Sequence, residues 1–227
     1  KTLTIIIMGY CRKYSRIYTT IDIVKEIKRF YDNRLLFSVF DINGKTIIKQ
    51  TECMYNGFDS IYFTKNNKLY VYGDNEYGQL GIGNNSDYMD IPTKNESLKD
   101  FEVQLISQGM SSFHCFVYTK DAQLYVFGFK DRMIYFSNNI KSDEHVYSPM
   151  LVDFKFDSTL KEIQCGPEHT LFLTQNGNVY GVGRNSHEQL LMDSLLVDDT
   201  NITQIINTSD IASIYCSYSS SYVLTDN

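Results

Sequence analysis

The sequence contains no Trp, three Pro and five Cys, and no long run of apolar residues. The Cys are spread evenly along the chain, which excludes a small disulfide-stapled secreted fold, and we expect reduced, mostly buried thiols. The apolar stretch 3–8 is only about half of a signal-peptide core and lacks a cleavage site. No stretch approaches the ~20 apolar residues of a membrane helix. We therefore expect no membrane association and a cytoplasmic location, with the nucleus as the other compartment that fits.

Positive charge is scarce beyond the first fifty residues. Residues 1–50 hold ten Lys or Arg and four Asp or Glu, whereas residues 51–227 hold eleven and twenty-three. An acidic body repels a polyphosphate backbone, so we expect no nucleic-acid partner for the larger part of the chain. The basic head stays open to acidic partners. A length of 227 residues with 43% apolar content is enough for one large domain or two small ones.

Three segments resemble one another without a gap. Each is an apolar strand ending in Thr, a polar turn, and a second strand closing on Gly, which predicts a β-hairpin. The Thr residues are spaced 55 positions apart, and a cut-off fourth copy, SYVLTDN, contains Thr225. The three full copies are SIYFTKNNKLYVYG (60–73), CFVYTKDAQLYVFG (115–128) and TLFLTQNGNVYGVG (170–183), with Thr64, Thr119 and Thr174 before the turns and Gly73, Gly128 and Gly183 at the ends.

The turns between these strands favour hairpins to different degrees. Asn66-Asn67 and Asn176-Gly177 tolerate the positive φ that a tight hairpin requires, whereas Asp121-Ala122 fits less well. Another extended piece precedes each hairpin, so each unit should contain at least three strands.

The run LYVYGDNEYGQLGIGNN (69–85), a later Pro92, then LISQG, a His and FVYT resemble the repeat of the regulator of chromosome condensation family. The resemblance implies an all-β fold: a partial, roughly four-blade β-propeller of the family's seven-bladed type. It covers roughly four-fifths of the chain. It divides the chain into an N-terminal strand and helix segment, 1–33, and propeller repeats in 34–227, namely a half-repeat 34–64 and repeats 68–119, 123–174 and 178–225.

The family's motifs are preserved unevenly between the copies. The second copy replaces the glycine-rich run by KDRMIYF, and in the fourth copy Ser217 and Ser220 stand where Gly and His belong. His114 fits the family's C-G-x-x-H pattern with a two-residue insertion before it. The matching residues are Asn75, Gly78, Gln79, Leu80, Gly81 and Gly83 in the first copy, and Asn185, Gln189 and Leu190 with Cys165, Gly166 and His169 in the third.

Three units and two halves should not close a ring alone. The sequence also begins with Lys and stops where a second hairpin strand should follow. We therefore expect a partial propeller or a segment of a longer protein. An open sheet edge would then have to be capped, or paired with missing blades or another chain.

Residues 19–32 carry the one convincing helical period. Thr19 and Asp22 have the spacing of a capping box. The segment faintly resembles the opening helix of F-box-like adaptors, which would recruit a ubiquitin-ligase subunit; we favour a local helix that covers the first blade edge. Its apolar face is formed by Ile23, Val24, Ile27, Phe30 and Tyr31, with Lys25, Lys28 and Arg29 opposite.

The glycine-rich runs 78–83 and 180–186 also have the composition of phosphate-binding loops. Such loops need a helix immediately afterwards, and no helical period follows either run. Cys165 and His169, with His114 and Cys115, are residue types that bind metals. Repeat copies radiate around a propeller, however, so we expect core or turn roles, and we assign no catalytic, cofactor-binding or metal-binding residues. His145 and His187 lie in polar stretches and should be solvated.

The resemblance implies a non-enzymatic protein-interaction scaffold, with a partner and a partner-binding surface that the sequence leaves unknown. The family's founding members are guanine-nucleotide exchange factors for the small GTPase Ran. Exchange needs no acid or base, because tighter binding to the nucleotide-free GTPase lowers nucleotide affinity by linkage. The alternatives are a ubiquitin-ligase substrate adaptor using the 19–32 helix and, less favoured, a hydrolase or metal enzyme.

Overall fold

The computed structural model describes residues 39–40, 46–48, 54–56, 60–84, 86, 88–108, 114–129, 145–190 and 201–225. The helix predicted at 19–32 and the segment 1–33 lie outside these residues. The elements are β1 (Val39–Phe40), β2 (Thr46–Ile48), β3 (Met54–Asn56), β4 (Ser60–Lys65), β5 (Lys68–Asp74), β6 (Tyr88–Lys94), the 3-10 helix η1 (Glu96–Leu98), β7 (Val103–Gln108), β8 (His114–Thr119), β9 (Leu124–Gly128), β10 (Val146–Leu151), β11 (Leu160–Cys165), β12 (His169–Thr174), β13 (Val179–Gly183), β14 (Thr203–Ile206), β15 (Ile211–Cys216) and β16 (Ser221–Thr225).

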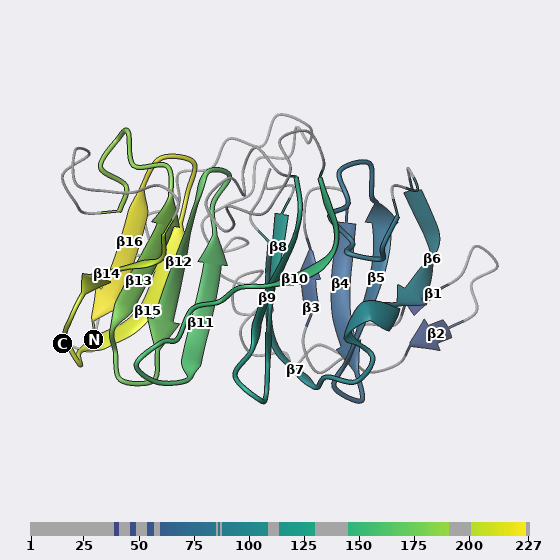
Figure 1. Ribbon diagram of the computed structural model, residues 1–227, viewed down its shortest axis with the longest axis horizontal. Helices are drawn as coiled ribbons and strands as arrows, with labels where there is room; N and C mark the ends of the chain where they lie inside the picture. Colours follow the sequence, from purple (N-terminus) through teal and green to yellow (C-terminus); the bar gives the residue numbers. More distant parts are fainter. Residues whose placement is uncertain are drawn as a thin grey trace, which may run out of the picture.

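The strands form antiparallel sheets in which neighbours along the chain are neighbours in space. Three sheets have four strands each, β3–β6, β7–β10 and β11–β14, and β15–β16 and β1–β2 form two-stranded sheets. The four-stranded sheets stand side by side along the long axis of the molecule (Figure 1). The first strands β3, β7, β11 and β15 contact one another in succession. This is the all-β, partial propeller that the sequence predicted. We call the three sheets the first, second and third blades and β15–β16 the terminal hairpin.

Each sequence repeat contributes strands to two blades. Repeat 68–119 supplies β5 and β6 to the first blade and β7 and β8 to the second. A repeat thus contains four strands, in agreement with the expected minimum of three. The terminal hairpin is an inner strand pair, because β15 follows the first strands of the other blades and no outer strands pair with it among the described residues.

The part of the chain that the structure describes contains no helix with the length and hydropathy of a membrane span.

Apolar side chains fill the space between successive blades. On β8, Cys115 and Val117 pack toward the first blade, while Phe116 and Tyr118 pack toward the third. A strand buried on both faces should be a continuous apolar run instead of an alternating one, which explains the CFVY sequence. A third cluster joins the third blade to the terminal hairpin through Leu171, Leu173, Val179, Leu190, Ile211 and Ile214.

The repeated glycines occupy equivalent positions. Gly73, Gly128 and Gly183 have φ values of 107°, 117° and 106°, and the last two pair with His114 and His169 in the register of their hairpins. A Cβ on Gly183 would lie 2.5 Å from the carbonyl oxygen of Glu168. These glycines therefore serve backbone geometry and close strand packing.

The hairpin turns differ in type. Asn66 and Asn67 have φ values of 53° and 57°, and Lys65 pairs with Lys68, which is the two-residue turn expected for two left-handed residues. In the second blade the turn is longer, and Ala122 takes the left-handed conformation at φ 63°. Gly177 takes the matching place in the third blade at φ 85°. Asp121-Ala122 was predicted to fit a tight turn less well, and the structure shows why: Ala122 has to adopt the left-handed conformation.

Candidate functional site

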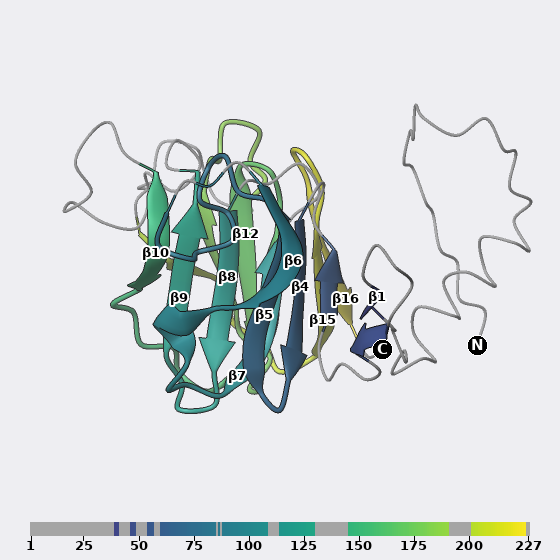
Figure 2. The same ribbon diagram turned by 90° about the vertical axis from the view of Figure 1, so that its right-hand side faces the viewer.

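The ends of the blades form two faces of the molecule. The turns of the β4–β5, β8–β9 and β12–β13 hairpins lie at the lower face in Figure 1, and the loops 75–84 and 184–190 lie at the upper face. The same strands are turned by 90° in Figure 2, where the hairpin turns again lie at the bottom. We call the upper face the loop face. It contains the family's Asn and Gln residues, so it is the candidate functional site.

The repeated polar residues hold the loops in shape. Asn75 Oδ1 accepts a hydrogen bond from Leu80 N at 3.0 Å, and Gln79 Oε1 accepts one from Tyr77 N at 2.9 Å. The backbone closes the same turn, since Gly78 N donates to Asn75 O at 2.9 Å. Asn75 and Gln79 are almost completely buried. Their amides satisfy backbone groups that water cannot reach. We call this arrangement the Asn–Gln turn.

The third blade repeats the Asn–Gln turn. Asn185 Oδ1 accepts from Leu190 N at 2.8 Å, and Gln189 Oε1 accepts from His187 N at 2.9 Å. Glu188 N donates to Asn185 O at 2.9 Å. Glu188 stands where the first blade has Gly78 and adopts φ 57°. The repeated Asn, Gln and Leu are therefore structural residues.

The glycines of the first loop are used for packing. A Cβ on Gly81 would lie 2.7 Å from the Phe127 ring of the second blade, and one on Gly78 would lie 2.7 Å from Tyr147. Beyond Gly83 the described chain leads into β6, and beyond Gly183 it enters the Asn–Gln turn. A phosphate loop needs a helix N-terminus at such a point, so these described segments lack the anion-binding element.

The His and Cys residues of the C-G-x-x-H pattern join successive blades. Nε2 of His114 lies 3.4 Å from Thr170 Oγ1, and Nε2 of His169 lies 3.0 Å from Ser221 Oγ. Cys165 Sγ donates to the carbonyl of Ser107 at 3.4 Å. The two His residues thus occupy the same place in successive blades, which confirms the insertion before His114. Among the described residues, no three His, Cys, Asp or Glu side chains gather as a metal ion would require.

His169 and Ser221 form a Ser–His pair that is arranged for structure. Ser221 Oγ donates to the carbonyl oxygen of Gln189 at 2.6 Å, so its single proton is already used. Nε2 of His169 must then be the donor toward Ser221, and it cannot accept the hydroxyl proton as a catalytic base would. Burial lowers the pKa of His169 to about 4, which keeps the ring neutral near pH 7. The pair fastens the terminal hairpin to the third blade.

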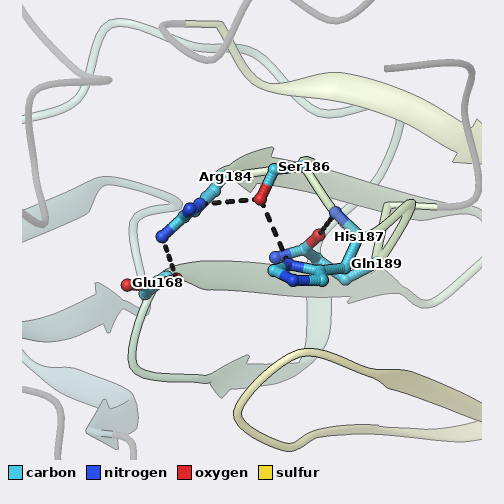
Figure 3. Close-up of polar contacts among 5 residues, drawn as sticks. All are labelled: Glu168, Arg184, Ser186, His187 and Gln189. Carbon is cyan, nitrogen blue, oxygen red and sulfur yellow. Dashed lines mark hydrogen bonds and ion pairs between the residues drawn. The ribbon is translucent and has the colours of Figure 1, made fainter.

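The side chains that differ between the copies lie at the loop face, where all of them are exposed except Asp74 and Tyr77, which are half-buried. At three equivalent sites, the first blade has Asp74, Glu76 and Tyr77 where the third has Arg184, Ser186 and His187. The three side chains of the third blade form a polar chain with Glu168 (Figure 3). The guanidinium contacts Glu168 Oε2 at 3.0 Å through Nη1 and Ser186 Oγ at 2.7 Å through Nε; Ser186 Oγ lies 3.1 Å from His187 Nδ1.

One solvation prediction holds in full and the other in part, because His145 is half-buried. His187 is exposed, as expected. His145 instead belongs to an aromatic group: its ring lies 5.0 Å from Phe129 and 5.4 Å from Tyr77, between ring centroids. The polar sequence around His145 concealed these partners, because one directly follows β9 and the other lies in the loop of the first blade. This group supports the second blade's side of the loop face.

Exposed apolar side chains lie on outer strands and on the terminal hairpin. Single exposed apolar residues are normal on protein surfaces and do not by themselves mark an interface. They are Tyr88 and Ile91 on β6, Leu151 on β10, and Tyr215, Tyr218, Tyr222 and Leu224 in the terminal hairpin.

Comparison with known proteins identifies the repeat. Residues 66–117 and residues 160–189 each match the regulator of chromosome condensation (RCC1) repeat. The chain is an RCC1-repeat protein. Both matches include Asn–Gln turn residues, and the first spans the β5–β8 unit that links two blades.

Curated relatives share the repeat within longer proteins. The Ultraviolet-B receptor UVR8 of Arabidopsis thaliana is 34% identical over 144 residues, which are 63% of this chain and 31% of the relative. The human probable E3 ubiquitin-protein ligase HERC4 is 28% identical over 63% of this chain and 13% of its own. The human X-linked retinitis pigmentosa GTPase regulator is 30% identical over 58% and 12%. The RCC1-repeat chain thus spans less than a third of these relatives.

Solved structures share the fold. Human WBSCR16 superimposes with a TM-score of 0.65 at 20% identity, covering 78% of this chain and 46% of its own. Yeast RCC1 (Prp20), solved bound to Kap60, gives 0.64 at 20% identity, covering 86% and 48%. A further structure of Prp20p from Saccharomyces cerevisiae, whose binding to Gsp1p and histones was studied, gives 0.61 at 21% identity, covering 79% and 45%. At such identities the likeness establishes the propeller fold.

The sequence did not single out the polar chain of Glu168, Arg184, Ser186 and His187. A signal was present, because Arg184 replaces Asp74 between two otherwise matching copies. Copies that keep their Asn, Gln and Leu but differ at the positions between them indicate which side chains face solvent. The sequence thus held the residue difference, and the structure supplied the contacts.

Proposed function

We propose that this RCC1-repeat chain is a non-enzymatic protein-interaction scaffold that binds a small GTPase and promotes guanine-nucleotide exchange. The observation that carries the proposal is the division of labour at the loop face. Repeated polar residues such as Asn75 and Gln79 are buried in internal hydrogen bonds, whereas the exposed residues between them differ from blade to blade. A rigid fold that presents varied loops is suited to recognising a protein surface.

Exchange by such a surface requires no chemical group of the scaffold. A scaffold that binds the nucleotide-free GTPase more tightly than the loaded form lowers nucleotide affinity by the same factor. Support comes from the similarity to the X-linked retinitis pigmentosa GTPase regulator and from the solved structure of Prp20p, a protein whose binding to Gsp1p was studied. A cytoplasmic or nuclear location, which we also propose, would give access to such partners.

Capture of nucleotide-depleted small GTPases tests this function. The immobilised chain should retain at least one member of a panel more than about tenfold better when depleted than when loaded with GDP. It should also accelerate release of a fluorescent GDP analogue from that GTPase. Lack of preference for the depleted form across the panel would refute exchange and leave a plain scaffold.

A ubiquitin-ligase adaptor is the second candidate, favoured by the similarity to HERC4 and by the apolar pattern in 19–32. Changing Ile23, Val24 and Ile27 to Lys should abolish co-purification of a ubiquitin-ligase subunit from cells and leave GTPase capture intact. A variant that still binds both the ubiquitin-ligase subunit and the GTPase would refute the adaptor function. A serine hydrolase is disfavoured because Ser221 Oγ donates its hydrogen bond to Gln189 O and not to a histidine base.

A further inference from the structure

The two Asn–Gln turns differ in one hydrogen bond. In the first blade, Gln79 Nε2 donates to the Asp74 carboxylate at 2.7 Å. In the third blade the residue equivalent to Asp74 is Arg184, and Gln189 Nε2 is buried with no acceptor among the described residues. Gln189 as a whole is 3% exposed. An N–H group that is buried without an acceptor costs free energy, so this donor calls for a ligand.

The orientation of both amides is fixed by the backbone. Gln79 Oε1 accepts from Tyr77 N at 2.9 Å, and Gln189 Oε1 accepts from His187 N at 2.9 Å. An amide turned the other way would place its NH₂ group against a backbone N–H, which cannot accept. The free group in the third blade is therefore a donor.

One cationic side chain, Arg184, belongs to the same loop as this donor, and it pairs with Glu168. The Arg184 side chain is 47% exposed and is anchored by Glu168 and Ser186. Figure 3 shows Arg184, Ser186, His187 and Gln189 gathered at the same end of the third blade. The guanidinium has five N–H donors, of which the contacts with Glu168 and Ser186 use only part. An acceptor at Gln189 Nε2 would lie near these groups.

We propose that the loop 184–190 binds the carboxylate of an Asp or Glu side chain of a partner protein. The first blade identifies this ligand, because the group that satisfies the equivalent Gln79 amide is the carboxylate of Asp74. In the third blade the partner supplies it in trans, with the Arg184 guanidinium as its counter-ion. The inference rests on the proposed scaffold function and gives the partner an acidic residue at its contact with the third blade.

Titration of the full ¹⁵N-labelled chain with a peptide tests the proposal. The probe is a tetraglutamate peptide blocked at both ends, and the matched neutral probe is blocked tetraglutamine. The side-chain Nε2 protons of Gln189, assigned by their loss in Gln189→Glu, should shift downfield and saturate at millimolar tetraglutamate, but not with tetraglutamine. No GTPase is involved, so the outcome is independent of the exchange assay.

Two variants make the test specific. Gln189→Glu retains an acceptor for His187 N but replaces the free donor by an acceptor, and it should weaken tetraglutamate binding at least about tenfold, the equivalent of about 1.4 kcal/mol. Arg184→Asp places a carboxylate as in the first blade. It should shift the Gln189 protons without any peptide and prevent further movement on titration.

The control for general electrostatics is Lys120→Gln. Lys120 belongs to the opposite face, where it pairs with Glu102 at 2.9 Å, and its removal should leave tetraglutamate binding unchanged. Gln189 protons that do not move with tetraglutamate, or a Gln189→Glu chain that binds as tightly as the parent, would overturn the proposal. Equal shifts with a neutral peptide that has only a free C-terminus would overturn the assignment to a side-chain carboxylate.

Discussion

His169 connects the third blade to the terminal hairpin through a hydrogen bond from Nε2 to Ser221 Oγ. The residue is 1% exposed, and its Nδ1 has no partner among the described residues. Protonation would place a positive charge on a buried ring at a cost in desolvation free energy, and burial therefore lowers the pKa of His169 to about 4. A His of this kind is neutral in the fold and titrates normally only when the chain unfolds.

The stability of the fold should therefore decrease between pH 6.5 and 4. The unfolded chain takes up a proton on His169 below about pH 6.5, whereas the folded chain does so only near pH 4, so acid favours unfolding. The loss from this residue at pH 4.5 is roughly 2 to 3 kcal/mol. Urea unfolding of the parent and of His169→Gln at pH 7 and 4.5 measures it, and the variant should lack this part of the decrease. An identical pH dependence in both chains would contradict the assignment.

The hairpins show how one element tolerates different turn residues. Across its own turn, Thr119 Oγ1 donates to Gln123 O and accepts from Gln123 N, both at 3.1 Å. Thr174 Oγ1 donates to Asn178 O at 3.3 Å in the equivalent turn. The third residue of each loop must be left-handed, and it is Ala122 in one blade and Gly177 in the other. An L-residue with a Cβ is strained in this conformation by about 1 to 2 kcal/mol.

Exchange of the two turn residues should have opposite effects. Ala122→Gly relieves the left-handed strain against a smaller entropic cost, so we expect stabilisation by about 0.5 to 1 kcal/mol. Gly177→Ala adds strain and places a Cβ 2.7 Å from the carbonyl oxygen of Thr208, so we expect destabilisation by about 2 kcal/mol or more. Urea unfolding at pH 7 compares the two. Destabilisation by Ala122→Gly would show that the Ala side chain contributes more than its conformation costs.

At the scale of the whole molecule, stability depends on contacts between neighbouring blades. Phe116 of the second blade and Phe172 of the third meet edge to face, with ring centroids 5.4 Å apart. Both rings are completely buried. In repeat architectures each unit is stabilised mainly by its neighbours, so this contact should couple the first two blades to the third blade and the terminal hairpin.

Phe172→Ala should weaken that coupling. We expect a loss of about 3 to 5 kcal/mol and a broader urea transition that separates into two steps, because each side then unfolds more independently. Circular dichroism and Tyr fluorescence follow the transitions, since the chain has no Trp. The control Tyr222→Ala removes a side chain that is 58% exposed and should change stability by less than about 0.5 kcal/mol. One cooperative transition with unchanged slope in Phe172→Ala would contradict blade-wise coupling.

The amino-acid sequence alone determined the features that depend on local geometry and recur. Thr and Gly at a fixed spacing predicted hairpins, and the glycine-rich runs were correctly interpreted as turns, because each copy must satisfy the same backbone demands within a few residues. Only the tertiary structure decided the features that depend on residues distant in the chain. Three such features arise where separate segments meet: the aromatic partners of His145, the hydrogen bond from Ser221 to Gln189 O, and the lack of a carboxylate partner at Gln189. A hydrogen bond forms only when its two atoms lie about 3 Å apart, and spacing along the sequence does not specify such positions.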